Sequence, residues 1–363
     1  MKAFNLLALD ENYEIIGALR PTNVQWDRMY HEAGKFSIQL PLSQYDKNIK
    51  YIYTKDRPEV GIVFKTSYLS VRTKSYIQLS GFFLESKLAR MIVYPNGNTN
   101  ITNSPNWEEQ SGKAEAVAFA FFNGFKSLST EDVTIDIGIT AGTSQNRGKD
   151  STHHRNGEDL AYKIYDILKP SGMSYRIDYD LNDNSQVFNV WIGEDRTQDN
   201  TDGNNPIIFS TVFGNIDKPN IILDDTDYYN GCIVVHETVE NDETIREVRA
   251  VLNEDDDDRS FTFLRSGLNK SEYTPEEFIE AMDSEGQTKL LETIKRINIE
   301  FDAITGSYEY GVDFNLGDLC SVEIVNMGLT ADVRLIGCYE VMKEGKWTMS
   351  MEFGTPMNIR IRR

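Results

Sequence analysis

The sequence predicts an α+β fold that is mainly β, with helices limited to a middle segment and one later stretch. Two observations lead to this prediction. Apolar and polar residues alternate over many short runs in residues 1–103 and again from about residue 207 onward, which is the pattern of half-buried strands. Between these regions, apolar residues twice recur at helical spacing, so we expect a small α/β segment to interrupt the strands.

Length and composition place the chain among soluble globular proteins. Its 363 residues suffice for two or three domains, and 40% hydrophobic with 26% charged residues is an ordinary balance. No run approaches the roughly 18 apolar residues of a membrane helix, and the N-terminal apolar run is too short for a signal peptide. Cys232, Cys320 and Cys338 lie far apart in strand-like runs. We therefore expect buried thiols in a reducing compartment and no export by the secretory route.

The formal charge of −20 argues against a surface that grips nucleic acid, because phosphate binding requires clustered Lys and Arg. Two interpretations of the acidic excess stay open. It can serve solubility alone, or it can line a passage through which DNA slides without binding.

Residues 1–103 are expected to form strands throughout, and the short, regular spacing indicates a barrel or a sandwich. A hairpin turn at 10–12 separates the first two strands. The expected strands cover about 4–9, 13–19, 24–29, 36–40, 60–64, 68–72, 76–84 and 91–94.

A stretch rich in Asn, Thr, Ser and Pro at 96–106 marks the expected end of this first region. Beyond it, apolar spacing predicts a helix over about 112–125 and another over 158–169, which Pro170 terminates. Strands are expected at 133–139, 173–179 and 186–192, a loop at 141–157, and a loop or boundary at 195–205. Together these elements make a small α/β unit.

From about residue 207 the chain returns to β structure, with strands expected at 229–237, 245–252 and 260–264. The strongest helix signal follows. Thr274 is placed as N-cap, Pro275 as the first helical residue and Glu277 as the glutamate of a capping box. We expect Gly286 to break this helix, which gives a short helix pair over 274–296. Residues 297–301 then lead into the last part of the chain.

Residues 311–354 predict an antiparallel meander of three strands, because alternation there is clean and short turns separate the runs. The expected apolar faces comprise Cys320, Val322 and Ile324, then Ala331, Val333, Leu335, Tyr339 and Val341, then Trp347, Met349, Met351 and Phe353. Glu340 is expected on the polar face of the second strand, with Asp332 and Arg334.

Short motifs also follow one another in a defined order along the chain. Their residues are Trp26, Gly34, Phe36 and Pro41, then Asp195 and Arg196, then Asn230 and Gly286, then Asp313, Leu316, Gly317, Asp318, Arg334, Phe353 and Gly354. This order resembles the tail-hub family of bacteriophages, which comprises baseplate hubs of contractile tails and their relatives in siphophage tails and phage-like injection machines.

The resemblance implies a structural protein and not an enzyme. In this family each chain carries two β-barrel tube domains, and three chains form a ring that adapts the sixfold tail tube to the threefold tip and leaves a central passage. Mapped here, residues 1–103 are the first tube domain, and 104–220 are an inserted α/β domain with a linker. Residues 221–363 are the second tube domain with the helix pair.

The implied partners are further copies of this chain, the tail tube or distal tail ring, and a spike or tail-fibre protein. The implied location is the virion tail, at the baseplate or tip, after synthesis in the bacterial cytoplasm. No catalytic residue, cofactor or metal is expected, and neither is specific nucleic-acid binding or membrane insertion. The motif residues are expected to act structurally.

Three patterns look like binding sites but lack required parts. Five residues rather than four separate Gly142 from Gly148, and Asp150 stands where a phosphate loop needs a Ser or Thr for magnesium. The stretch 178–189 begins like a calcium loop but lacks its glycine and its bidentate glutamate, so a hairpin turn is expected. The histidines at 153–154 lie in a predicted polar loop without partners at metal spacing.

Two functions of other classes stay open. One is a tail-tip peptidoglycan hydrolase that shares the N-terminal hub. No zinc-protease or serine-hydrolase motif occurs, and we expect no appended lytic domain, because the chain ends at Arg363 straight after the meander. The other is a carbohydrate-binding adhesin in which the middle segment presents Trp107, Tyr175 and Trp191.

Overall fold

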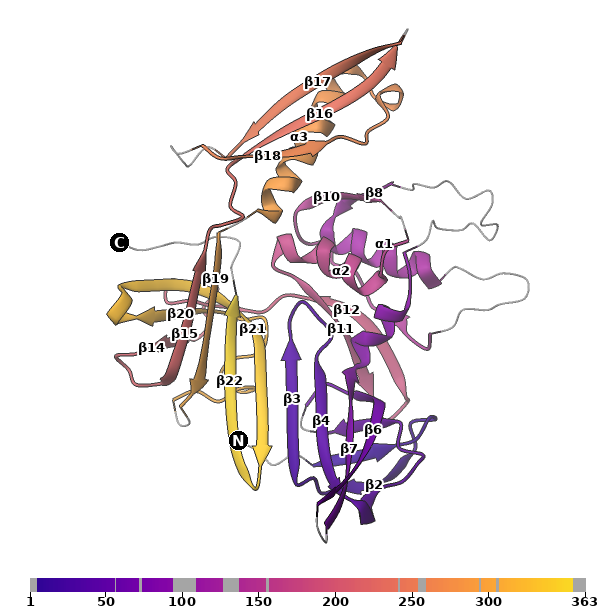
Figure 1. The fold of residues 1–363 in the computed structure, drawn as a ribbon, viewed down its shortest axis with the longest axis vertical. Helices are drawn as coiled ribbons and strands as arrows, with labels where there is room; N and C mark the ends of the chain where they lie inside the picture. The colour runs from indigo at the N-terminus through magenta and orange to yellow at the C-terminus, as the bar shows by residue number, and fades with distance from the viewer. Residues whose placement is uncertain are drawn as a thin grey trace, which may run out of the picture. The chain divides into compact units, whose positions relative to one another are not determined.

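The computed structural model describes residues 5–354 apart from 56, 72–73, 94–108, 127–136, 155–156, 241, 254–258, 294 and 305–306. The chain divides into two compact units, of which unit 1 is Met1–Asn220 with Ile299–Arg363 and unit 2 is Ile221–Asn298. Strands dominate both units (Figure 1), so the expectation of a mainly β fold is confirmed. No described helix is long and apolar enough to span a bilayer.

Strands fill the N-terminal part of unit 1, as alternation predicts. They are β1 (Leu6–Leu9), β2 (Ile15–Leu19), β3 (Asn23–Met29), β4 (Lys35–Pro41), β5 (Tyr51–Thr54), β6 (Gly61–Val71) and β7 (Lys74–Phe83), with 3₁₀ helices η1 (Leu42–Gln44) and η2 (Leu84–Arg90). The strands expected at 60–64 and 68–72 are parts of the single strand β6, and β5 was not expected. At 91–94 the described residues form only a bridge between Ile92 and Asp159.

The middle segment is the expected α/β unit. It contains β8 (Glu109–Lys113), α1 (Ala114–Lys126), β9 (Thr140–Ala141), β10 (Asp150–His154), α2 (Leu160–Leu168), η4 (Lys169–Ser171), β11 (Ser174–Asp180) and β12 (Ser185–Trp191). Both helices pack on the β11–β12 hairpin, where the ring of Phe122 stacks on Phe188 with centroids 4.3 Å apart. Strand β10 lies inside the stretch expected as a loop at 141–157, because it pairs with β8. The expected boundary at 96–106 and most of the expected strand at 133–139 lie outside the described residues.

A single sheet of fourteen strands joins the two ends of the chain. Its later strands are β13 (Asp195–Arg196), β14 (Ile208–Ser210), β15 (Ile216–Asp224), β19 (Arg296–Ala303), β20 (Leu319–Ile324), β21 (Leu329–Lys343) and β22 (Lys346–Gly354). The main path runs β15–β19–β22–β21–β3–β4–β7–β6–β5–β1–β2, and β20 joins β13 and β14 to β21. The meander expected at 311–354 is therefore confirmed, and its middle strand β21 pairs with β3 of the N-terminal region.

A bulge in β21 corrects the expected face pattern of that strand. Leu335 lies opposite Phe353, whereas Gly337 lies opposite Glu352, so the register shifts at the intervening residue. One extra residue exchanges the two faces of a strand beyond it. Glu340 is therefore buried, and the expectation that it lies on the polar face, with Tyr339 and Val341 on the apolar face, is wrong.

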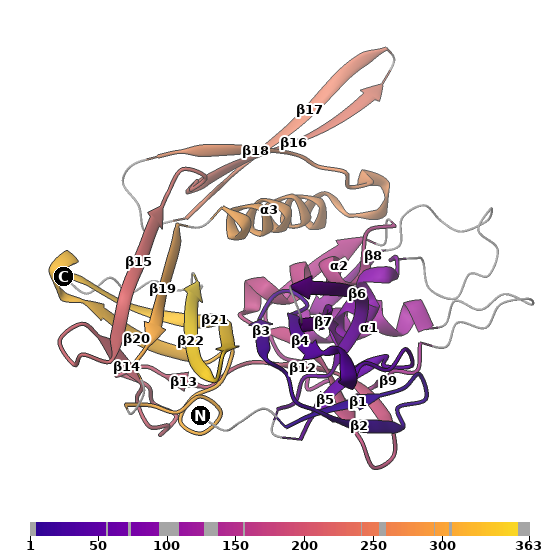
Figure 2. The ribbon, with the colours of Figure 1, turned by 60° about the horizontal axis from the view of Figure 1, so that its bottom comes forward.

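Unit 2 is a three-stranded sheet covered on one face by a helix (Figure 2). Its elements are β16 (Gly231–Glu240), β17 (Glu243–Leu252), β18 (Phe261–Arg265), η5 (Lys270–Glu272) and α3 (Pro275–Glu292). Strand β16 is central, antiparallel to β17 and parallel to β18. The Thr274 hydroxyl accepts from the Glu277 N–H, and the Glu277 carboxylate accepts from the Thr274 N–H, which confirms the capping box.

The expected helix pair is wrong, because α3 continues through Gly286 as one helix. A Cβ at this position would lie 2.6 Å from Val251 and 2.9 Å from Val234. Glycine is therefore required for the close approach of α3 to the sheet, and packing outweighs its helix cost of about 1 kcal/mol.

Candidate functional site

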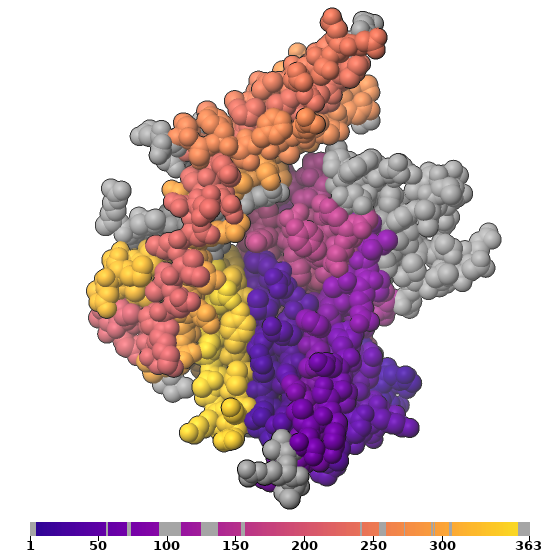
Figure 3. Space-filling view, viewed as in Figure 1, coloured from indigo at the N-terminus to yellow at the C-terminus, as the bar shows by residue number. Residues whose placement is uncertain are grey.

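The pairing of β3 with β21 is the place where the N-terminal and C-terminal parts of the chain meet. Seven residue pairs join the two strands, from Gly337 opposite Met29 to Lys343 opposite Asn23. Figure 3 shows the indigo and yellow segments in contact along this line. A candidate site of structural function therefore lies on and around these two strands.

Four charged side chains from three separate places form an ion-pair network across this junction. The Arg28 guanidinium on β3 contacts Glu59 at 2.8 Å and Glu340 on β21 at 2.9 Å. Arg57 donates two hydrogen bonds, of 2.9 and 2.8 Å, to the same Glu340 carboxylate. The Trp26 indole N–H donates to Glu59 at 3.2 Å. This charge network therefore ties β3, β21 and the β5–β6 connection together.

Burial makes the charge network depend on complete pairing. The side chains of Arg28 and Glu340 are 1% and 2% exposed. Burial alone would raise the pKa of Glu340, but hydrogen bonds from Arg57 and the charges of both arginines outweigh it and hold that pKa below its usual value. An unpaired charge at this depth would cost several kcal/mol, so the arrangement selects one register of β3 against β21.

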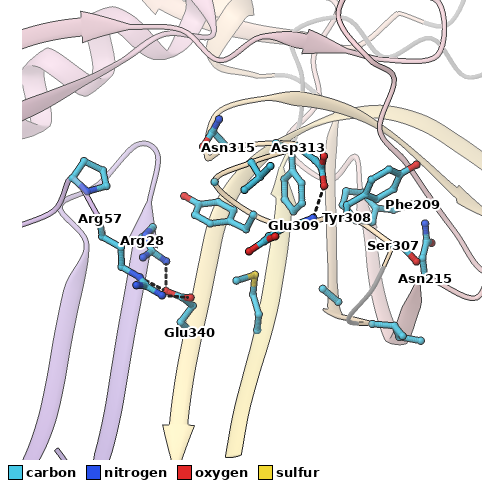
Figure 4. Close-up of a pocket in the computed structure, with 18 residues that line it drawn as sticks. Arg28, Arg57, Phe209, Asn215, Ser307, Tyr308, Glu309, Asp313, Asn315 and Glu340 are labelled. Atoms are coloured by element: carbon cyan, nitrogen blue, oxygen red, sulfur yellow. Dashed lines mark hydrogen bonds and ion pairs between the residues drawn. The ribbon is translucent and has the colours of Figure 1, made fainter. Parts of the chain in front are cut away.

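A pocket of about 600 Å³ opens beside the charge network (Figure 4). Arg28, Arg57 and Glu340 lie at one end, and the loop that connects β19 with β20 forms the opposite wall. Within that loop, Asp313 accepts from the Glu309 N–H at 2.7 Å. The described lining contains no histidine or cysteine, and no three or more metal-ligating side chains gather anywhere in the described residues.

Two of the sequence motifs meet at Asp318, which is buried. Its carboxylate accepts from the N–H groups of Glu194 and Asn315, each at 2.8 Å, and from Arg196 at 3.0 Å. Asp195 lies opposite Leu319 in the parallel pair of β13 and β20. Burial raises the pKa of Asp318 despite these hydrogen bonds. The structure therefore brings 194–196 and 315–318 together.

The loop between β19 and β20 requires a glycine at position 317. Its φ is +87°, and a Cβ there would lie 2.4 Å from the ring of Tyr30. Arg334 on β21 donates to the Gly317 carbonyl and lies over the same ring, 5.7 Å from its centroid. The Tyr30 hydroxyl in turn donates to the Gly172 carbonyl at 2.9 Å. Tyr30 thus connects the α/β segment to the central sheet.

The remaining motif residues of unit 1 serve packing. Trp26 contacts Phe36 and Phe83 with ring centroids 5.7 and 4.8 Å apart, and Gly34 allows Phe83 to approach. Phe353 stacks on Phe301, and Gly354 lies against Ile336. Pro41 ends β4, Leu316 is buried, and Asp313 lies in the pocket loop.

The other two motif residues belong to unit 2. Asn230 is buried and its side chain accepts from the Ser260 N–H at 2.8 Å, which joins the starts of β16 and β18. Gly286 lies within α3, on the side of the helix that faces Val251 and Val234 of the sheet. These two residues support the fold of unit 2 and are not part of the junction site.

Sequence reasoning missed Arg28, Arg57, Glu59 and Tyr30. A signal for Arg28 exists, because two-residue alternation puts it on the same face of the strand at 24–29 as the apolar Val24 and Trp26. Partners for it could not be found, since Glu340 is turned inward by the bulge and 57–59 lies between strands. All three cysteines are free and buried, as expected.

Two of the three patterns that looked like binding sites lie in strands or in the turn between them. Asp180 accepts from the Asn182 N–H at 2.8 Å in the β11–β12 turn, so the expected hairpin is confirmed. The histidines at 153–154 lie on β10 rather than in a loop. Of the aromatics proposed for sugar binding, Tyr175 is buried and Trp191 is half-buried against Tyr30, while Trp107 lies outside the described residues.

Comparison with known proteins places the chain in a family. Residues 6–355 match a family model described as Siphovirus ReqiPepy6 Gp37-like protein. No curated protein matches the chain.

Three solved structures share the fold over almost the whole length. A 43 kDa tail protein of prophage MuSo2 from Shewanella oneidensis is 11% identical, with a TM-score of 0.59 over 96% of this chain and 98% of that one. A tail protein from Neisseria meningitidis MC58 is 11% identical, with a TM-score of 0.56 over 98% and 97%. Prophage tail protein gp18 from Listeria monocytogenes EGD-e is 10% identical, with a TM-score of 0.53 over 98% and 95%.

Proposed function

This chain belongs to the family of Siphovirus ReqiPepy6 Gp37-like proteins, and from that membership we propose that it is a structural hub of a phage tail or phage-like particle. Three copies form a ring that adapts the sixfold tail tube to the threefold tip and leaves a central passage. The observation that carries the proposal is the family match over residues 6–355, together with tail proteins of the same fold.

The chemistry of the junction supports a structural role. Its charged side chains are engaged with one another, as in the contacts of Glu340 with Arg28 and Arg57. Such a network favours a single register of the two strands, which suits a structural role rather than a catalytic one. A rigid connection between the two parts of the chain is what a load-transmitting ring needs. In this proposal the protein is therefore not an enzyme and holds no cofactor.

The ends of the large sheet support assembly into a ring. Its path ends at β15 and at β2, and both strands expose large apolar residues: Ile15 is 55% exposed and Ile222 is 52% exposed. Open edges of this kind present unpaired backbone groups to which another chain can add a strand. A neighbouring copy would supply it, and permanent interfaces bury about 2,000–5,000 Å².

In the proposed ring, residues 1–103 and 221–363 curl into the two tube-forming barrels, which the β3–β21 pairing joins through one continuous sheet, and 104–220 is the insertion. The further partners are the tail tube or distal tail ring on one side and a spike or tail-fibre protein on the other. The charge of −20 suits a passage that DNA crosses without binding. The site of action is the tail tip of the virion.

The test is to purify the tailed particles made by the phage or prophage that encodes this chain, and to count copies of the chain in them by native mass spectrometry and quantitative peptide analysis. We expect three copies for each tail, with the chain retained when free protein is washed away. Absence of the chain from the particle would overturn the proposal, and so would cell-wall cleavage by the purified chain.

A further inference from the structure

A groove of about 880 Å³ lies in unit 1 at the ends of several strands. Its lining comes from the start of β1, the end of β2, the starts of β3 and β7, and the β21–β22 hairpin. We call it the base groove. Its apolar lining includes Leu6, Leu19, Pro21, Tyr76, Met342 and Trp347.

The floor of the base groove is firm. Leu6 and Leu19 are buried, and Met342 and Trp347 pack on the core of the N-terminal strands. Met342 and Trp347 also lie directly opposite each other in the hairpin. A partner side chain placed here would meet a surface that does not need to rearrange, which reduces the cost of ordering on binding.

Cations outnumber carboxylates at the base groove, although the formal charge of the whole chain is −20. Arg20 and Lys74 line it and are exposed. Lys343 and Lys346 flank the turn residues Glu344 and Gly345, which line the groove, and lie directly opposite each other across that turn. Glu344 is the one carboxylate in the described lining, against four cations in or beside it. None of these four forms an ion pair with another described residue. Like charges in direct opposition are unfavourable, and a partner's carboxylates would relieve this repulsion.

The position of the base groove separates its partner from the neighbours in the proposed ring. A copy that extends the sheet sideways would meet the edge of β15 or β2. The groove instead lies mainly where strands end, so a partner seated in it approaches along the strands.

We infer that the base groove docks an acidic segment of a different tail protein, with an aliphatic or aromatic side chain on the groove floor and carboxylates on the surrounding cations. This inference rests on the proposed function, because it needs an assembled particle. Because the chain carries a net charge of −20, a groove at which cations outnumber carboxylates is a distinct local feature, and complementary charge is what selects and orients such partners.

The test places a photo-crosslinking amino acid at Ala18, an exposed groove residue, in chain assembled into particles. We expect cross-links to one other tail protein, within a peptide that carries Asp or Glu beside a large apolar residue. The yield should fall at high salt. Cross-links mainly to a second copy of this chain, or to a peptide without carboxylates, would overturn the inference.

Charge reversal supplies the second arm. Arg20→Glu with Lys74→Glu should lower the Ala18 cross-link about tenfold or more. The matched control, Lys47→Glu with Lys149→Glu, makes the same charge change outside the groove and should leave the yield unchanged. An unchanged yield in the groove variant would contradict the inference.

Two further measurements keep the result interpretable. If the groove variant melts below the wild-type temperature, Lys343→Gln with Lys346→Gln replaces it, with an expected loss of about threefold. A second cross-linker at Ile222 on β15 reports on the ring. Self-cross-links from Ile222 without a partner at the groove would overturn only this inference, whereas absence of the chain from particles would overturn the proposed function.

Discussion

Removal of the Glu340 charge is the sharpest test of the junction. Its carboxylate makes three contacts of 2.8–2.9 Å with two arginines, and breaking a buried pair costs about 3–5 kcal/mol. Glu340→Gln keeps an acceptor, so we expect the lower value of about 3 kcal/mol. At an unfolding entropy of about 2.1 cal/mol/K per residue, this lowers the Tm of a unit of this size by about 5 °C.

The assay is thermal unfolding of the full chain by circular dichroism at pH 7. Glu300→Gln, on an exposed strand position of the same unit, is the matched control and should change stability by less than about 0.5 kcal/mol. Arg28→Met and the double variant complete a cycle, for which we expect a coupling of about 1–3 kcal/mol. Additive single effects, or a Glu340 variant as stable as the control, would refute the reasoning.

The pH dependence has a definite sign. The pKa of Glu340 in the folded protein lies below its usual value, so its contribution to stability is present above about pH 4.3. It is lost as the pH falls through the depressed pKa. The Tm difference between wild type and Glu340→Gln should therefore shrink below about pH 4.

Three further substitutions test single features by Tm. Gly317→Ala should lower the free energy of unfolding by about 2 kcal/mol or more, because Gly317 has a φ of +87° and a Cβ there would contact the ring of Tyr30. The control Gly203→Ala, with a φ of +80° in open space, should lower it less. Equal losses of stability would exclude the ring contact as a cause. Gly286→Ala should destabilise unit 2 although alanine has the better helix propensity, while Ser284→Ala should slightly stabilise it. A Gly286→Ala variant more stable than wild type would show that the space between α3 and the sheet can hold a Cβ. Burial raises the pKa of Glu85 to about 7, so ionisation costs stability as the pH rises from about 4.3 to 7. Glu85→Gln should therefore raise Tm more at pH 8 than at pH 5, and an equal gain at both values would contradict the assigned pKa.

Local patterns predicted most elements because strand alternation and helix caps act over a few residues. The meander at 311–354, α1, α2 and the cap of α3 all follow from such signals. The failures need tertiary information. The bulge before Gly337 reverses the faces of β21, and Gly286 continues a helix because a sheet lies against it.

Only part of the candidate site could be predicted from the sequence. Asp318 and Gly317 stood out as motif residues, but nothing local indicated that 194–196 would supply their partners. Arg28 and Glu340 lie 312 positions apart along the chain and meet only because β3 pairs with β21. Pairing between distant strands depends on the whole fold, so no short window of sequence contains it.

The most direct test of the central claim is a cryo-electron microscopy reconstruction of the tail tip of a particle that carries this chain. The account predicts three copies around the tail axis, each with β3 paired to β21 in one sheet beside an open passage. A single off-axis copy, or a ring in which the two parts of the chain lie in separate sheets, would contradict it.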